Sequence, residues 1–169
     1  CEGYMDVIAL HQAGFTNAVA ALGTSFTMDH ARLLSRYTDE VILIFDADAA
    51  GQKGAQRAIG MLRETGLRIR LVTIPDGKDP DEFIKNMGAE AFEERIRQAE
   101  NSFFFELRIL ERDYNMQDPQ EKTNFHKAIA KKLCSFSEEM ERENYIEAVA
   151  EKYHIGFESL RMMVSQYGN

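Results

Sequence analysis

The chain has 169 residues, of which 44% are hydrophobic and 28% charged, enough to bury one ordinary core and a smaller helical addition. Its formal net charge is −8 and neither half is basic, whereas nucleic-acid binding usually rests on a Lys/Arg surface. Any polynucleotide contact must therefore be assisted by a metal ion or shared with other segments.

The first hundred residues alternate apolar, β-branched stretches with segments of helical spacing, which indicates a parallel sheet with crossover helices. The predicted strands are Ala18–Leu22, Val41–Phe45 and Ile69–Ile74. The predicted helices are Tyr4–Ala13, a helix capped by Thr27 that runs to about Tyr37, Gly51–Thr65, and a helix capped by Asp79 that begins at Pro80. The sheet should be small, with helices on its flanks.

The chain changes character at about Asn101, after which no strand-like run occurs. Helical segments follow one another over Ser102–Tyr114, Pro119–Phe136, Glu138–Tyr153 and Phe157–Tyr167. We therefore predict an α/β domain over residues 1–100 and an all-α helical subdomain over residues 101–169. The run Phe103-Phe104-Phe105 is better explained by core packing than by a base-stacking platform, because three adjacent residues cannot share one helix face.

The cysteines and the apolar runs argue against zinc-binding, disulfide-rich and membrane-spanning proteins. Cys1 and Cys134 stand alone, so neither zinc nor a disulfide framework is expected. No apolar run reaches the ~18 residues of a membrane span and no leader opens the chain, so we expect a cytoplasmic protein without membrane contact. The chain starts directly before Glu2-Gly3, without an apolar strand leading into that turn, which we interpret as the mark of an excised fragment.

Acidic residues cluster where strands are predicted to end, the edge at which open parallel sheets gather functional groups. Glu2 would end a strand that precedes the chain, with Asp6 in the first turn of the next helix. Asp46-Ala47-Asp48 follows the second predicted strand, and Asp79-Pro80-Asp81 follows the third. Extended backbone would point both side chains of each aspartate pair to one side.

These carboxylates suit a hard divalent ion, because Mg²⁺ prefers oxygen ligands and shares them with water and phosphates. Without a cation, converging carboxylates would repel one another. Structural roles compete for some of them: Asp6 can favour a helix dipole, Asp79 can be a cap, and acidic loops are commonly only solvated. Lys53, Arg57, Lys78 and Lys85 lie nearby in the sequence and could meet phosphates or be solvated. The four histidines are scattered and favour surface or packing roles.

Four ordered motifs closely resemble the Toprim domain of bacterial DnaG-type primases: Glu2-Gly3-Tyr4-Met5-Asp6, Gly23-Thr24-Ser25, Asp46-Ala47-Asp48-Ala49-Ala50-Gly51, and Asp76-Gly77-Lys78-Asp79-Pro80-Asp81. The resemblance covers about residues 2–100. The helical remainder is similar, with less specific motifs, to the subdomain that closes the RNA-polymerase region of those primases.

The resemblance implies a Toprim fold and a metal-dependent nucleotidyltransferase that makes RNA primers on a single-stranded DNA template from ribonucleoside triphosphates. It implies that Glu2, Asp46 and Asp48 are catalytic and bind Mg²⁺, with Mn²⁺ as an alternative, and that Asp6, Asp79 and Asp81 support the metal site. A replicative helicase would bind through a region outside this chain. The fragment alone should be nearly inactive.

Other Toprim proteins leave two alternatives open. A nuclease or topoisomerase fragment would share the carboxylates but cleave or transfer phosphodiester bonds. A DNA-binding mediator without catalysis would depend little on them.

Overall fold

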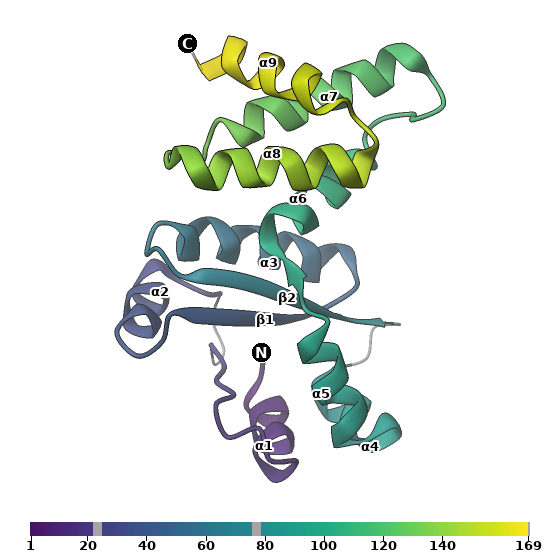
Figure 1. Cartoon of the computed structure of the whole chain (residues 1–169). Coiled ribbons are helices and arrows are strands. Elements are labelled where there is room, and N and C mark those ends of the chain that lie inside the picture. Colours follow the sequence, from purple (N-terminus) through teal and green to yellow (C-terminus); the bar gives the residue numbers. More distant parts are fainter. Residues whose placement is uncertain (22–24, 76–78, 169) are drawn as a thin grey trace. The chain divides into compact units, whose positions relative to one another are not determined.

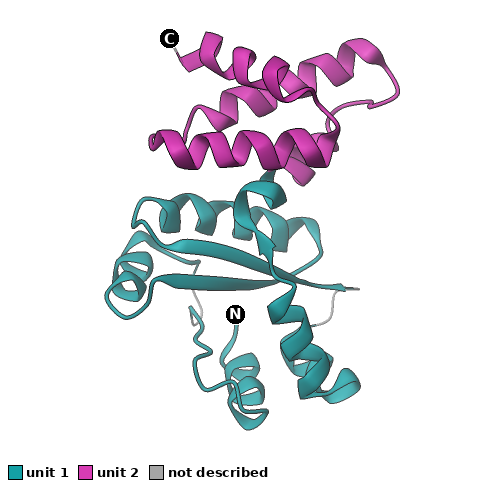
Figure 2. Ribbon diagram, viewed as in Figure 1, with its two compact units in different colours: residues 1–106 teal, residues 107–169 magenta. Residues whose placement is uncertain are grey.

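A computed structural model of the chain describes residues 1–21, 25–75 and 79–168. It divides into two compact units, residues 1–106 and 107–169, with the division inside one helix (Figure 2). Among the described residues, no helix combines the length and the apolar character needed to cross a membrane.

The first unit is built on a small mixed sheet of strands β1 (Glu40–Asp46), β2 (Arg68–Ile74) and β3 (Glu100–Asn101), in that order (Figure 1). β1 and β2 are parallel, with Asp46 opposite Ile74, and β3 is antiparallel to β2. The ladder continues one step further, because the Ala47 N–H donates to the Ile74 carbonyl at 3.1 Å. The carboxyl ends of β1 and β2 are therefore held side by side.

Helices cover both faces of this sheet (Figure 1). On one face, Val72 and Ile74 form a buried cluster with Leu10 of α1 (Tyr4–Gln12), Phe83 of α4 (Pro80–Met87) and Phe92 of α5 (Ala89–Arg97). The other face is covered by α3 (Ala49–Arg63) and the start of α6 (Ser102–Glu111), where Phe105 packs edge-on against Phe45. Successive side chains of a strand point to opposite faces of the sheet, so the continuous apolar runs of β1 and β2 make both faces apolar.

Most helices of this unit begin where the sequence predicts. α2 (Met28–Ser35) starts after Thr27, whose hydroxyl accepts the His30 N–H while the His30 side chain accepts the Thr27 N–H. Gly14 (φ 101°) and Gly66 (φ 79°) follow α1 and α3 in the left-handed region that favours glycine. The prediction that the phenylalanine run belongs to the core is confirmed, since Phe103 and Phe105 are buried.

Two predictions about the sheet are wrong. Residues 18–21 form no strand, and Leu22 lies outside the described residues; β1 is an edge strand in the part of the sheet that the structure describes. A single main-chain bond, from the Cys1 amino group to the Val19 carbonyl at 3.2 Å, ties the 18–21 segment to the first residues. Apolar, β-branched residues give a strand only when a neighbouring strand satisfies their backbone groups. The sheet is also mixed rather than parallel throughout, because β3 is antiparallel to β2. The sequence did not reveal β3, since its two polar residues are too few to give a periodic signal.

The second unit is helical, with α7 (Pro119–Leu133), α8 (Glu139–Tyr153) and α9 (Phe157–Gly168). Its buried core comes from all three helices: Phe125, Ile129, Leu133, Ile146, Val149, Leu160 and Val164. Asp118 caps α7 ahead of Pro119, and Glu138 caps α8. The predicted run of helices is confirmed, with ends shifted by a few residues.

Candidate metal centre

Asp46 and Asp48 lie at the junction between β1 and α3. Asp46 is the last residue of the strand, and Asp48 is the N-cap of the helix, where Oδ1 accepts the Gly51 N–H at 2.6 Å. A β-carbon on Gly51 would clash with the Asp46 carbonyl oxygen, at a separation that real β-carbon atoms essentially never show. The sharp strand-to-helix turn that presents both aspartates therefore requires glycine at position 51.

The third acidic pair lies at the start of α4. Asp79 caps this helix, with Oδ1 accepting the Glu82 N–H at 2.8 Å, and Asp81 lies within its first turn. Asp81 and Lys85 form an ion pair at 3.0 Å. The prediction that both aspartates of this pair lie in extended backbone is therefore wrong for Asp81. Asp81 is helical, and its carboxylate points to Lys85, one turn further along the helix.

Glu2 and Asp6 come from the start of the chain, but they differ in environment. Glu2 is exposed just before α1, whereas Asp6 is buried in its first turn with 8% of its surface accessible. Asp6 Oδ1 accepts the Asp81 N–H at 3.4 Å and so connects α1 to the start of α4. Burial raises the pKa of Asp6, and the nearby charge of Asp79 raises it further, while main-chain donors at Asp81 and Gly3 oppose the shift.

Asp46 is the carboxylate on which the neighbouring negative charges act most strongly. Burial, together with the charges of Glu2, Asp48, Asp79 and Asp6, raises the pKa of Asp46 to about 6. Five carboxylates from three separate segments are therefore close enough to interact. Asp81 does not contribute to this shift.

The donor set fits a divalent cation, because it is made of carboxylate oxygens whose mutual repulsion a positive ion would relieve. In the described part of the chain, no three acidic, histidine or cysteine side chains are close enough to enclose one ion. Mg²⁺ is usually held by only one or two carboxylates together with water and substrate phosphates. The arrangement thus suits an open site of that type better than a closed structural one.

Two features of the site differ from, or are missing from, what the sequence predicts. α3 begins at Ala49 rather than Gly51, so Asp48 is a helix cap; an aspartate before Ala-Ala is the signal that could have shown it. The steric need for Gly51 could be seen only from the backbone. Among the basic residues, Lys85 pairs with Asp81, while Lys53 and Arg57 are exposed. Lys78, together with the motif residues at positions 23, 24, 76 and 77, lies outside the described residues.

Comparison with known proteins agrees with this architecture. The sequence model of the Toprim-like family matches residues 1–84, and that of the DnaB-helicase binding domain of primase matches residues 104–158. The DNA primase of Clostridium acetobutylicum is 37% identical over 164 residues, which are 97% of this chain and 27% of that protein. The Escherichia coli K12 DNA primase is 48% identical over 101 residues, 58% of this chain and 17% of that protein.

Solved structures give the same result at the level of the fold. A DNA primase domain from Pseudomonas aeruginosa matches with a TM-score of 0.75 and 31% identity, covering 97% of this chain and 52% of that one. A DnaG primase catalytic domain bound to single-stranded DNA matches with a TM-score of 0.76 and 37% identity, covering 91% and 50%.

The fold and the acidic loops define a Toprim-like module, followed by a helical module of the kind found in primases. The chain belongs to the bacterial DnaG-type DNA primase family. It spans about a quarter of the length of the curated relatives that it matches along nearly all its length. The match over residues 104–158 does not support the expectation that helicase-binding sequence lies wholly outside the chain.

Proposed function

We propose that this chain is the metal-binding part of a DNA primase, an enzyme that joins ribonucleoside triphosphates into RNA primers on single-stranded DNA. The observation that carries the proposal is the convergence of charge on Asp46, whose pKa is raised to about 6 by burial and by four other carboxylates. Such a site is costly without a cation and well suited to phosphate chemistry with one. The family membership supports this reaction over the cleavage reactions of other Toprim enzymes.

The proposed ion is Mg²⁺, with Mn²⁺ able to replace it. When bound, it would neutralise charge that develops on the reacting phosphates and help to position the attacking hydroxyl. Asp46 and Asp48 would hold metal at the triphosphate, and exposed Glu2 would hold metal near the attacking oxygen. Asp79 would add negative charge to the same loop cluster.

Asp6 and Asp81 have a more indirect role in this proposal. The Asp6 side chain holds the Asp81 N–H, and the Asp81 carboxylate is paired with Lys85. Both contacts fix the start of α4, on which Asp79 is the cap. We therefore expect these two residues to act chiefly by positioning Asp79.

The isolated chain should make few or no primers. Its net charge is −8, and it covers about a quarter of its curated relatives, so a basic template surface would have to come from other parts of the protein. Adding template and ribonucleotides to residues 1–169 alone should give no primers above background. Robust synthesis would contradict this expectation.

A helicase contact through the second unit is a further part of the proposed function. The match to a helicase-binding domain of primase over residues 104–158 supports it, since this range includes α7 and α8. Its test is binding of the replicative helicase to the full-length protein with and without residues 107–169.

The primary test is primer synthesis by the complete protein with Asp46→Asn. We expect a loss of about 100-fold or more, because one metal ligand is removed without loss of volume. Asp39→Asn is the matched control, since Asp39 is exposed just before the opposite end of β1, about 20 Å away. The same samples are assayed for cleavage of single-stranded DNA. Unchanged synthesis in the Asp46 variant, or cleavage without synthesis in the wild type, would refute the proposal.

A further inference from the structure

The helical unit separates its charges by helix. α7 carries Lys122, Lys127, Lys131 and Lys132 against one glutamate. α8 carries Glu139, Glu141, Glu143, Glu147 and Glu151 against one arginine and one lysine. One helix of the unit is thus basic and another is acidic, although the chain as a whole is acidic.

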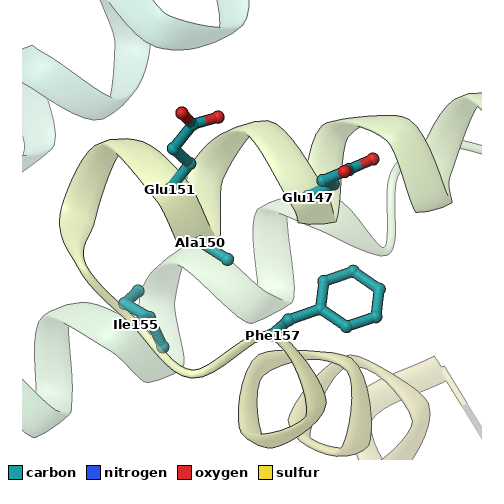
Figure 3. A pocket seen from close by; sticks show the side chains of 5 residues that line it. All are labelled: Glu147, Ala150, Glu151, Ile155 and Phe157. Carbon is teal, nitrogen blue, oxygen red and sulfur yellow. The ribbon is translucent and has the colours of Figure 1, made fainter.

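A cavity of about 450 Å³ lies at the carboxyl-terminal half of α8, the acidic helix. It is lined by Glu147, Ala150 and Glu151 from α8, by Ile155 from the turn, and by Phe157 at the start of α9 (Figure 3). Its volume is in the range of binding pockets. Two glutamates and three apolar residues therefore line one open pocket.

The two carboxylates are placed to receive one cation. Glu147 and Glu151 are four residues apart on a helix, so they are neighbours on its surface, and Figure 3 shows both projecting from the same side of α8. Both are exposed, and neither carboxylate has an ion-pair or hydrogen-bond partner among the described residues. By contrast Glu143, on the same helix, pairs with Arg161 at 3.2 Å.

The apolar part of the cavity is held by a fixed turn. His154 ends α8 in the left-handed conformation (φ 54°), and the Ile155 N–H donates to the Ala150 carbonyl at 2.9 Å. The Leu160 N–H donates to the Gly156 carbonyl at 3.0 Å and starts α9. Phe157 remains 37% exposed, which is high for a phenylalanine next to a packed core.

We propose that this cavity, which we call the α8–α9 pocket, docks an amphipathic helix of a partner protein that carries both lysine or arginine and leucine-like side chains. A basic side chain would lie between Glu147 and Glu151, and an apolar side chain one turn away would cover Ile155 and Phe157. Charge complementarity selects this occupant, because an acidic helix would place like charges against both glutamates. The inference concerns the helical unit alone and depends on neither the metal site nor primer synthesis.

The test uses the 169-residue chain and a fluorescein-labelled synthetic helix of about 16 residues, with leucines and lysines on one face. Fluorescence anisotropy should show saturable binding. Glu147→Gln with Glu151→Gln should weaken it by about tenfold or more, and Phe157→Ala should weaken it by a similar factor. The matched control, Glu139→Gln with Glu141→Gln, removes the same charge from the other end of α8 and should change binding by less than about twofold.

A second experiment reverses the charges on both the protein and the peptide, so that it measures a gain of binding rather than a loss. Glu147→Lys with Glu151→Lys should bind a peptide in which glutamates replace the lysines better than the wild type does. Circular dichroism and thermal unfolding of each variant identify any that fail to fold, and those are replaced by the single substitutions. Absence of binding, equal loss in the pocket and control variants, or no preference of the reversed variant for the reversed peptide would overturn the proposal.

Discussion

The two units distribute their carboxylates differently, and the difference separates the proposed metal site from the proposed protein-binding surface. In the first unit, the start of the chain and the ends of β1 and β2 bring five carboxylates together, and burial and the four neighbouring charges raise the pKa of Asp46 to about 6. In the second unit, glutamates are spread along α8, where most meet solvent. Carboxylates that are crowded together repel one another, and a bound cation would relieve this repulsion. Carboxylates that are spread along a helix repel one another only weakly. Net negative charge therefore has different consequences in the two units.

The largest expected effect comes from emptying the core of the helical unit. Phe125 is fully buried, and its ring packs against Tyr114 and Tyr153 with centroids 5.5 Å apart in each case. Phe125→Ala should destabilise this unit by about 3–5 kcal/mol, because it removes buried apolar surface and leaves a cavity. Urea unfolding followed by circular dichroism measures the loss.

Mn²⁺ binding by the same variant tests whether the two units are independent. If the two units carry separate roles, Phe125→Ala should leave Mn²⁺ binding at Asp46 unchanged under conditions in which the first unit stays folded. A parallel loss of Mn²⁺ affinity would break the comparison between the units.

A smaller effect is expected at the turn that presents the aspartates. Gly51→Ala forces a β-carbon against the Asp46 carbonyl oxygen, so it should cost about 1–3 kcal/mol and weaken metal binding. Gly54→Ala is the matched control on the same helix, since a β-carbon there meets no atom within 4 Å. That change should instead stabilise the chain by about 0.5–1 kcal/mol. Thermal unfolding and Mn²⁺ titration of both variants give the test, and equal behaviour would contradict the steric account.

The smallest effect is a dependence on pH in metal-free buffer. An unfolded aspartate ionises at about pH 4, whereas the folded Asp46 has a pKa of about 6. The folded chain therefore binds the proton more tightly, and stability should fall as the pH rises from about 4 to about 6. Asp46→Asn removes this fall, so at about pH 8 it should be more stable than the wild type by about 1 kcal/mol, a value reduced for solvent screening.

Chelator-treated samples unfolded across this pH range measure that difference. Adding Mg²⁺ should then stabilise the wild type and not the variant, because only the wild type keeps the full set of ligands. A difference in stability between the two proteins that does not grow from about pH 4 to about pH 6 would show that the pKa of Asp46 is not raised.

The sequence predicted those parts of the structure that depend on local patterns. β1 and β2 are continuous apolar runs, and the starts of α2 and α4 follow from the caps Thr27 and Asp79. The 18–21 segment was not predictable in this way, because a strand needs a neighbour and apolar character does not reveal one. β3 is too short for a pattern and exists only because residues 100–101 lie beside Arg70 and Leu71.

For the candidate site, too, the sequence shows which acidic residues are present but not the surroundings of each one. The acidic motifs singled out six carboxylates, of which five interact around Asp46, but their environments depend on tertiary structure. The contact between Asp6 and the Asp81 N–H joins residues 75 positions apart, and no spacing in the sequence indicates it. Likewise, the motif Asp79-Pro80-Asp81 does not show that Asp81 turns toward Lys85 once the helix forms. Which of the six bind metal stays a prediction.

The most direct test of the account is a crystal structure of the chain soaked in Mn²⁺, with the ion located by its anomalous scattering. We expect a peak within coordination distance of Asp46 and Asp48 oxygens, about 2.2 Å, with Glu2 or Asp79 nearby and no direct bond to Asp81. A peak bound by Asp81, or no peak at Asp46 at an Mn²⁺ concentration that supports primer synthesis by the complete protein, would contradict it.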